Sequence, residues 1–288
     1  MLEDCSSLNA IELSGDKTVT LDLNGKVLGI PFISKAKTFN ITDKSTDANG
    51  RLLPADGLCA LEVNAGTTNF DKGFIESVKK VAVMVKGDAS NKATFNFKGG
   101  EIISDTETTA TASEDGGAVC VIDNSEFNMT GGIIRNPSKR ALWTRSFTTG
   151  TYPYTNIHDG VLISGNGNVY YVYTRAKVTI DGGLFIGVGE YPVCHNGTSN
   201  AEVENNIKGG YFVCGKTYEW SGYNATSVGT YHFTGGHYAH SPKMYNSNTK
   251  ATSNVSAEAG YAVATMATPE TKTFEGVTYT FTHEIKAQ

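Results

Sequence analysis

Two adjacent glycines recur along this chain within one short pattern, and this recurrence constrains the fold more than any other feature. An alternation of apolar and polar residues precedes each pair, and a short apolar run follows it. The best copies occupy residues 95–103, 127–135, 178–186, 205–213 and 231–239, and weaker copies occupy residues 21–25, 39–43, 61–66 and 156–163. From residue 95 onward, successive copies are 23 to 32 residues apart. A repeat of this length with variable insertions is typical of stacked, quasi-linear architectures.

Each copy of the pattern has a simple physical interpretation. In the first good copy, Phe95 and Phe97 lie on one face of an extended strand and Asn96 lies on the other. The glycine pair permits a positive φ, so the chain can turn a corner without a clash at Cβ. A third strand-like run lies upstream of several copies, at residues 118–122, 141–144 and 169–173. Three short strands in each repeat predict an all-β fold, a single right-handed three-sided parallel β-helix (solenoid) of roughly eight to ten coils.

The glycine pairs stop before residue 250, and the last segment has a different character. We therefore assign residues 1–250 to the β-helix and residues 251–288 to a C-terminal β cap of the same domain, because an uncapped coil leaves strand edges unpaired. Within the cap, strands at residues 261–264 and 277–282 are expected to be antiparallel and joined through Pro269. Two alternatives stay open: a β-sandwich or barrel for the whole chain, and a short amphipathic helix over residues 74–85 instead of the preferred strand from Val81.

The repeat resembles that of a known class of proteins. The stretch that runs from Ala118-Val-Cys-Val to Ser125-Glu-Phe-Asn-Met-Thr-Gly-Gly is similar to the coil repeat of bacterial surface proteins with a pectate-lyase-like β-helix. Residues 16–25 and 235–263 resemble the opening and closing units of such arrays. The resemblance implies a secreted or cell-surface protein with a role in adhesion or glycan contact. It covers nearly the whole chain, but its motifs specify the coil and not a ligand.

Charge and hydropathy exclude some classes of partner. The formal net charge is −5 and the sequence has no basic stripe, so no nucleic-acid partner is expected. No run of 18 apolar residues is present, so no membrane span is expected. No leader peptide is recognisable before the first strand-like segment, and we expect further domains in a longer precursor.

The five cysteines show no CxxC or metal-finger spacing. Counted back from the glycine turn, one position is shared by successive repeats and is occupied by Cys120, Trp143, Tyr171 and Cys194. Cysteines that are several repeats apart in one position cannot reach each other. We therefore expect buried free thiols rather than disulfides.

Aromatic residues are unevenly distributed. All fourteen tyrosines follow residue 150 and both tryptophans follow residue 140, and the insertions at residues 147–154 and 218–223 are rich in them. Exposed aromatic rings on a flat sheet suit the apolar faces of sugar rings. The candidate ligand-binding residues are Trp143, Tyr152, Tyr154, Tyr170, Tyr173, Tyr218, Trp220 and Tyr223. The alternative is that the tyrosines fit strands and stack in ladders without binding anything.

The other candidate metal ligands or catalytic groups are His232, His237, His240, Asp159, Asp181, Arg145 and Arg175. The histidines lack a third ligand, so neither a metal nor another cofactor is expected. The two aspartates occupy equivalent turn positions, where Asp is favoured for backbone hydrogen bonding alone. The arginines are candidate anion contacts without converging carboxylates.

Together these observations predict a non-catalytic extracellular binding or cell-adhesion module, whose partner is a glycan or a cell-surface protein. Glycan recognition through the aromatic residues of the second half is the preferred form of this hypothesis. Two alternatives stay open. A polysaccharide lyase or glycoside hydrolase of β-helix type would need paired acids or a calcium-binding carboxylate cluster in a groove. A purely structural stalk would display another domain.

Overall fold

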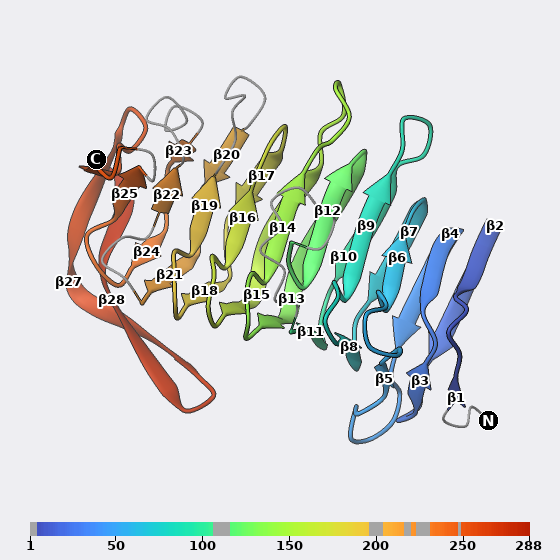
Figure 1. Cartoon of the computed structure of the whole chain (residues 1–288). Helices are drawn as coiled ribbons and strands as arrows, with labels where there is room; N and C mark the ends of the chain where they lie inside the picture. The colour runs from blue at the N-terminus through green and yellow to red at the C-terminus, as the bar shows by residue number, and fades with distance from the viewer. Residues whose placement is uncertain (1–4, 106–115, 196–203, 216–219, 223–230, 247–248) are drawn as a thin grey trace.

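A computed structural model describes residues 5–105, 116–195, 204–215, 220–222, 231–246 and 249–288. Every regular element in these residues is a β-strand, and the twenty-eight strands share one hydrogen-bonded sheet. Nearly all pairs are parallel and join a strand to its counterpart one repeat later, as the row of aligned arrows in Figure 1 shows. The prediction of an all-β chain with mostly parallel pairing is confirmed.

The parallel pairs form three ladders that share the long strands β2 (Ile11–Asp22), β4 (Phe32–Thr42), β13 (Ser125–Asn136) and β15 (Tyr154–Ser164). Ladder 1 contains β7 (Gly66–Phe70), β10 (Ala93–Phe97), β17 (Lys177–Ile180), β20 (Glu204–Ile207) and β23 (Tyr231–Phe233), besides parts of all four long strands. Ladder 2 contains β1 (Cys5–Ser6), β3 (Val27–Gly29), β5 (Arg51–Leu52), β8 (Phe74–Ser77), β11 (Glu101–Ser104), β18 (Leu184–Gly187), β21 (Tyr211–Cys214) and β24 (His237–Tyr238), besides parts of β13 and β15. Ladder 3 contains β6 (Leu61–Val63), β9 (Val83–Gly87), β12 (Val119–Asp123), β14 (Leu142–Arg145), β16 (Tyr170–Val172), β19 (Val193–His195), β22 (Trp220–Gly222) and β25 (Lys243–Asn246), besides parts of β2 and β4.

The glycine pairs form the corner between ladder 1 and ladder 2, and their two members have different tasks. The second glycine has a positive φ, for example 82° at Gly132 and 86° at Gly183, as the sequence pattern predicts. The first glycine allows close stacking: a Cβ added at Gly182 would lie 1.8 Å from the carbonyl oxygen of His158, one repeat earlier. Where both glycines are present, the pair turns the chain and brings successive repeats together, whereas the copy at residues 156–163 has Asp159 at the first position and keeps only the turning glycine, Gly160.

The core lies between the three ladders and is built from rings and branched side chains stacked in register. Phe95, Phe97 and Phe127 are completely buried, as the alternation of the repeat predicts. Their rings stack on one another along the ladder, with centroids 5.9 Å apart between Phe95 and Phe127. Phe185 and Phe212 repeat this arrangement in ladder 2 at 4.9 Å. A parallel ladder places like residues above like residues, so the repeated sequence pattern is sufficient to produce these stacks.

The last three strands are antiparallel: β26 (Thr252–Asn254) pairs with β25, and β27 (Tyr261–Phe274) forms a hairpin with β28 (Val277–Ala287). The antiparallel arrangement is as predicted, but the joining point is not. Pro269 lies inside β27 at a break in the strand register, and the chain turns at Glu275 and Gly276, which both have positive φ. Two consecutive positive φ values give the tight hairpin turn, and an exposed edge strand tolerates the missing N–H of proline.

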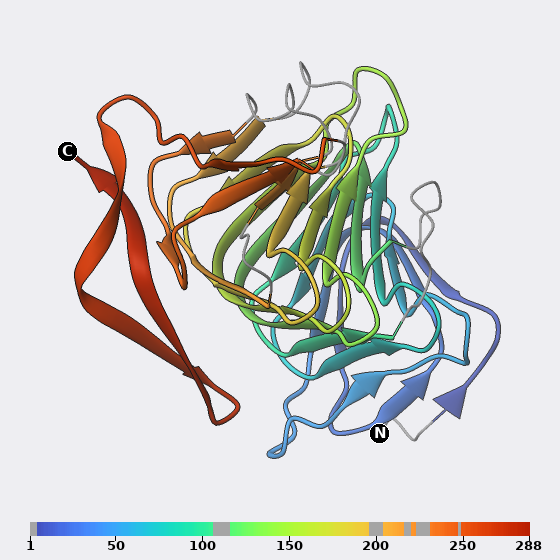
Figure 2. The same cartoon turned by 60° about the vertical axis from the view of Figure 1, so that its left-hand side comes forward.

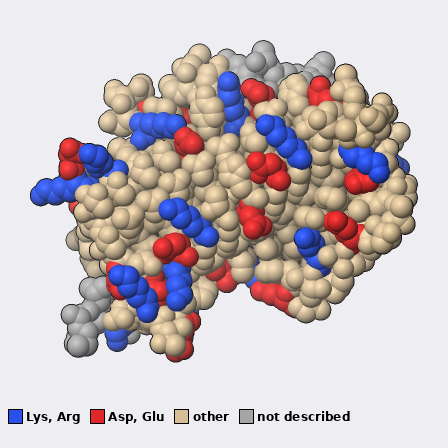
Figure 3. All heavy atoms as spheres, turned by 180° about the vertical axis from the view of Figure 1, so that it is seen from behind, with Lys and Arg blue, Asp and Glu red and all other residues tan. Residues whose placement is uncertain are grey.

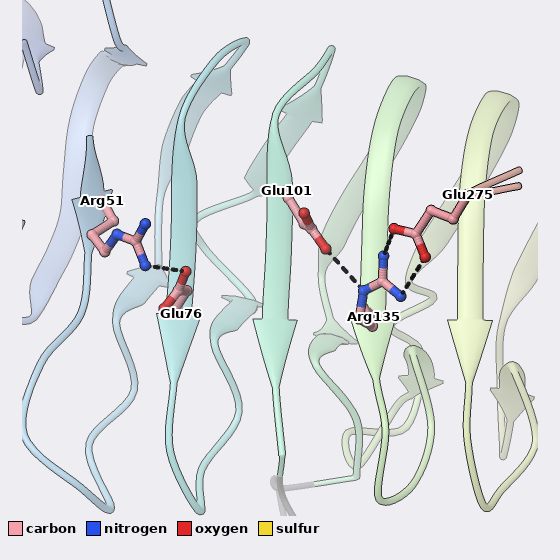
Figure 4. A network of polar contacts seen from close by, with 5 residues as sticks. All are labelled: Arg51, Glu76, Glu101, Arg135 and Glu275. Carbon is pink, nitrogen blue, oxygen red and sulfur yellow. Dashed lines mark hydrogen bonds and ion pairs between the residues drawn. The ribbon is translucent and has the colours of Figure 1, made fainter. Parts of the chain in front are cut away.

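The hairpin does more than cover the end of the ladders, because it also lies along the outer face of ladder 2 (Figures 1 and 2). Phe281 is completely buried against Leu184 and Ile186 of that ladder. Glu275, at the hairpin turn, forms an ion pair with Arg135 of β13 (Figure 4). This docking buries apolar outward residues that the sequence pattern leaves exposed.

The strand interpretation of residues 74–85 is confirmed, since β8 and β9 occupy this stretch and no helix does. In the residues that the structure describes, no helix has the length and apolar character needed to cross a membrane.

Candidate functional site

The outward positions of ladder 3 form a second apolar cluster, outside the core. The pairing register places Cys120, Trp143, Tyr171 and Cys194 side by side on successive repeats, as the sequence predicts. Four cysteines, Cys59, Cys120, Cys194 and Cys214, are buried free thiols, which confirms that prediction for these residues. Burial raises the pKa of the Cys59 thiol, so this group stays protonated and is a poor nucleophile.

This burial corrects part of the predicted binding surface. Trp143 and Tyr170 have no exposed surface, so the expectation that they contact a ligand is wrong. Tyr170 points into the core and donates a hydrogen bond to Thr144 at 3.0 Å, and Trp143 packs in the ladder 3 cluster. Both are aromatic residues used for packing, which was the alternative interpretation of the sequence.

The other predicted residues fall into two groups. Tyr152, Tyr154 and Tyr173 are at least partly exposed and lie at the corner where ladder 3 passes into ladder 1. Tyr218 and Tyr223 lie outside the described residues. Trp220 is in β22 and its backbone pairs with strands β19 and β25, but its side chain is outside the described part of the chain.

Arg145, at the end of β14, is clamped between two aromatic rings on the ladder 3 side of this corner. Its guanidinium carbon lies 4.0 Å from the ring centroid of Phe147 and 4.4 Å from that of Tyr173. Burial between the rings lowers the pKa of Arg145 from its ordinary value, although Tyr173 opposes this effect. The group remains a cation at any physiological pH. Phe147 keeps 39% of its surface exposed, so the clamp is open to a ligand on one side.

Lys177, at the start of β17, forms a second cation–aromatic group on the ladder 1 side of the same corner. Its ammonium lies 5.9 Å from the ring centroids of both Tyr152 and Tyr154. Lys92 approaches Tyr154 from the preceding side at 5.7 Å. Tyr154 is 40% exposed. We call the two groups together, Arg145, Phe147, Tyr173, Tyr152, Tyr154 and Lys177, the aromatic corner.

The loop that carries Phe147 is held by Asp123, a residue that the sequence reasoning missed. The buried carboxylate of Asp123 accepts hydrogen bonds from the backbone N–H groups of Phe147 at 2.7 Å and Thr148 at 2.9 Å. The Ser146 hydroxyl donates a third bond at 3.1 Å. Asp123 also has a positive φ of 56°. The sequence does contain a signal for this role: Asp123 comes directly after a buried strand and one repeat before an insertion. Aspartate commonly caps turns at such positions.

A groove of about 390 Å³ lies on the same outer face of ladder 3, nearer the N-terminus. Its floor includes Cys59, Val81 and Met84, and Lys35 and Glu62 stand at its rim. The second carboxylate of the groove, Asp88, accepts bonds from the backbone of Ser90 and Asn91 and caps its own loop. The groove therefore combines a small apolar floor with a larger number of charged and polar side chains around it.

Several of the remaining polar candidates are engaged in local pairs. Asp181 accepts a bond from His158 at 2.8 Å, and Asp159 caps the N–H of Gly160. His232 pairs with Glu258 at 2.7 Å. Among the described residues, no group of three or more histidine, cysteine, aspartate or glutamate side chains is placed to hold a metal ion. The features with the clearest capacity to bind are thus the aromatic corner and the groove beside it.

Comparison with protein-family models, with curated proteins and with solved structures finds no match to this chain. The resemblance to bacterial surface proteins therefore remains a prediction.

Proposed function

We propose that this chain is a non-catalytic extracellular binding or adhesion module that holds a glycan at the aromatic corner. The observation that carries the proposal is the Arg145 clamp, in which a cation is held between two rings and one of these rings stays exposed. Aromatic faces pack on the apolar faces of sugars, and guanidinium and ammonium groups donate hydrogen bonds to sugar hydroxyls and carboxylates.

We also propose the finer architecture that this function needs: a right-handed three-sided parallel β-helix over residues 1–250, with residues 251–288 as its cap. The three ladders and the regular return of each strand one repeat later support it. Crossovers between parallel strands are right-handed in nearly all known cases. Such a rod fits a secreted or cell-surface protein, since its flat outer faces can display a binding site at a fixed place.

The rigidity of the corner supports binding without catalysis as the main role. Its loop is anchored to the preceding repeat by three hydrogen bonds to Asp123, so its rings are positioned before a ligand arrives. Preorganised side chains lower the entropy cost of association. The six residues of the corner contribute two cations and four rings, and the carboxylate of Glu204 beside them is paired with Lys177 at 3.8 Å, so the corner suits recognition better than proton transfer.

The test is a glycan array that displays neutral, uronate-bearing and sialylated oligosaccharides, probed with the whole chain and with Arg145→Ala and Tyr154→Ala. We expect binding to at least one class, weakened about tenfold by each substitution. Arg51→Ala is the matched control, because Arg51 also lies over a ring, that of Phe74 at 4.9 Å, but on the outer face of ladder 2. Binding that survives both corner substitutions, or that is lost equally in the control, would reject the aromatic corner as the site.

A further inference from the structure

Five asparagines form a continuous row of hydrogen bonds along the outer face of ladder 1. From the second member onward, each side-chain amide nitrogen donates to the amide oxygen of the asparagine one repeat earlier, at 2.8 to 2.9 Å. The members of this asparagine row are Asn40, Asn69, Asn96, Asn128 and Asn156. All are half-buried, and all four bonds between them run in one direction. Thr20 continues the row at one end, and Thr179 occupies the next position at the other.

The row has hydrogen-bonding capacity beyond the bonds that hold it together. A carboxamide has two N–H donors and an oxygen with two lone pairs, and a bond along the row uses one donor and one lone pair. Asn128 is an exception on the donor side, because its second N–H already donates to Glu126 at 3.1 Å. The row therefore presents alternating donors and acceptors that repeat at the spacing between strands, about 4.8 Å.

The residues beside the row are polar and balanced in charge. On one side the register places the hydroxyls of Thr38, Thr67 and Thr94 next to one another. Glu126 follows them and is paired with Lys92 at 2.5 Å. Figure 3 shows the side of the molecule that is turned away from the viewer in Figure 1. On this side, too, basic and acidic side chains are interspersed, with no large area of one sign. A surface without net charge that offers amides and hydroxyls suits an uncharged, hydroxyl-rich ligand.

The asparagine row is continuous with the aromatic corner. Beside the asparagine row, Tyr154 comes next after Glu126 in the row of side chains that begins with Thr38, Thr67 and Thr94. Asn156 lies two residues beyond Tyr154 in the same strand, so both side chains face outward. A chain of sugars that starts on the ring of Tyr154 can thus continue along the amides without leaving the face.

From these relationships we infer that the asparagine row is an extended binding surface for a linear, uncharged, β-linked polysaccharide that lies along the stacking direction. An extended chain of sugar rings advances by a length similar to the strand spacing, so successive rings meet successive carboxamides. The inference rests on the proposed function for the class of ligand, but it adds a surface on a different ladder and predicts that affinity depends on chain length.

The test compares cellobiose, xylobiose and mannobiose with cellohexaose, xylohexaose and mannohexaose on the ¹⁵N-labelled chain. At least one hexasaccharide should bind about fivefold or more tighter than its disaccharide, because additional hydrogen bonds form along the row. The side-chain amide signals of the row should shift with the hexasaccharide. The double variant Asn69→Thr/Asn96→Thr should lose this gain while still folding, because threonine already occupies the row at Thr179. Asn206→Thr, beyond Thr179 in the same row, is the matched control and should keep the gain.

The outcomes separate this inference from the proposed function. If disaccharide and hexasaccharide bind equally and both depend on Arg145, the aromatic corner stands and the extended surface is rejected. If the double variant binds the hexasaccharide as tightly as the original chain, or if only corner signals shift, the extended surface is likewise rejected. If none of the three hexasaccharides binds, the extended surface is rejected. The aromatic corner is then tested by the glycan-array experiment alone.

Discussion

Arg135 and Glu275 are 140 residues apart in the chain and form a two-bond ion pair, with Nη2 2.5 Å from Oε1 and Nη1 3.3 Å from Oε2 (Figure 4). Glu101 holds the same guanidinium from the preceding repeat, at 2.9 Å from Nε. The pair fastens the turn of the C-terminal hairpin to the outer face of ladder 2. Its partners are partly exposed, so the hairpin depends mainly on apolar contacts such as that of Phe281 and only secondarily on this pair.

Replacement of Glu275 by glutamine should loosen the hairpin without unfolding the ladders. We expect a loss of about 0.5–1 kcal/mol in the free energy of hairpin opening, since a partly exposed ion pair contributes about this much. Hydrogen exchange of the amides in β27 and β28 should become faster, and high salt should reduce the difference. Glu284→Gln is the matched control, because Glu284 pairs with Lys286 of the same strand. Unchanged exchange in Glu275→Gln, or equal changes in both variants, would contradict the role given to this pair.

Asp43 should make part of the stability dependent on acid pH. Burial by itself raises the pKa of this carboxyl, but hydrogen bonds from Ser45, Gly50 and Gly25 outweigh burial and lower the pKa below its ordinary value. A lowered folded-state pKa stabilises the protein above the unfolded value of about 3.9, and this contribution is lost as the pH falls through the folded-state pKa. Acid unfolding below about pH 4 should therefore be steeper in the original chain than in Asp43→Asn.

At neutral pH the same substitution should cost about 1–3 kcal/mol, since an amide nitrogen would face the N–H of Gly50, now 2.6 Å from the carboxylate. Urea unfolding followed at several pH values measures both effects. Asp47→Asn, an exposed position in the same loop, should change neither. The prediction fails if Asp43→Asn and Asp47→Asn have the same pH profile.

Gly182 tests whether close stacking, and not only turning, requires the first glycine of each pair. Its φ is not positive, so alanine would be acceptable to the backbone, yet the new Cβ would lie 1.8 Å from the His158 carbonyl oxygen. We expect Gly182→Ala to destabilise the protein by about 3 kcal/mol or more, because the repeats would have to separate. Gly117→Ala, whose Cβ would meet nothing closer than 3.3 Å, should cost far less. Thermal unfolding of both variants decides the point, and equal melting temperatures would refute the stacking argument.

Asp123→Ala should weaken glycan binding although Asp123 is not expected to touch the ligand. Removing the carboxylate leaves the partly buried N–H groups of Phe147 and Thr148 without their acceptor, at a cost of about 1 kcal/mol. The loop should then exchange its amide hydrogens faster, and the affinity measured on the array should fall. Asp88→Ala is the control, because Asp88 caps a similar loop away from the corner. Rapid exchange with unchanged affinity would show that the loop takes no part in binding.

The free thiols should be inert in the folded protein. Cys59, Cys120, Cys194 and Cys214 are buried, and burial raises the pKa of Cys59. Reaction with a thiol reagent should label at most one cysteine per native chain and all five after unfolding. In Cys5→Ser, native labelling should disappear. Rapid native labelling of two or more thiols, or a disulfide found by mass spectrometry, would contradict the buried state of these residues.

Much of the fold was accessible from the sequence because the repeat encodes short-range requirements. The alternation around Phe95 specifies which face of a strand is buried, and Gly132 marks a corner that only a residue tolerant of positive φ can make. The shared position of Cys120 and Trp143 in successive repeats predicted their pairing. Each of these properties depends on residues within one repeat or on the repeat spacing.

The candidate site was less accessible, because burial of an outward residue depends on distant segments. Trp143 occupies an outward position, yet neighbouring residues cover it completely, and Gly116 lies so close to its ring that an added Cβ would be 2.4 Å from Cδ2. Tyr170 was indistinguishable from Tyr173 by residue type, although register places one inward and the other at the surface. A signal was present, because Tyr171 shares the repeat position of Trp143, and alternation along the strand then directs Tyr170 to the opposite face.

By itself the sequence determined the all-β class, the parallel stacking of like on like, the buried rings and the free thiols, since a period of glycines and alternating residues is a local property of the chain. Only the tertiary structure decided where the hairpin lies, which aromatic rings stay exposed, and that Arg145 is held between Phe147 and Tyr173. The physical reason is that these features depend on contacts between segments that are far apart in the sequence, and a local residue pattern does not specify how such segments lie relative to one another.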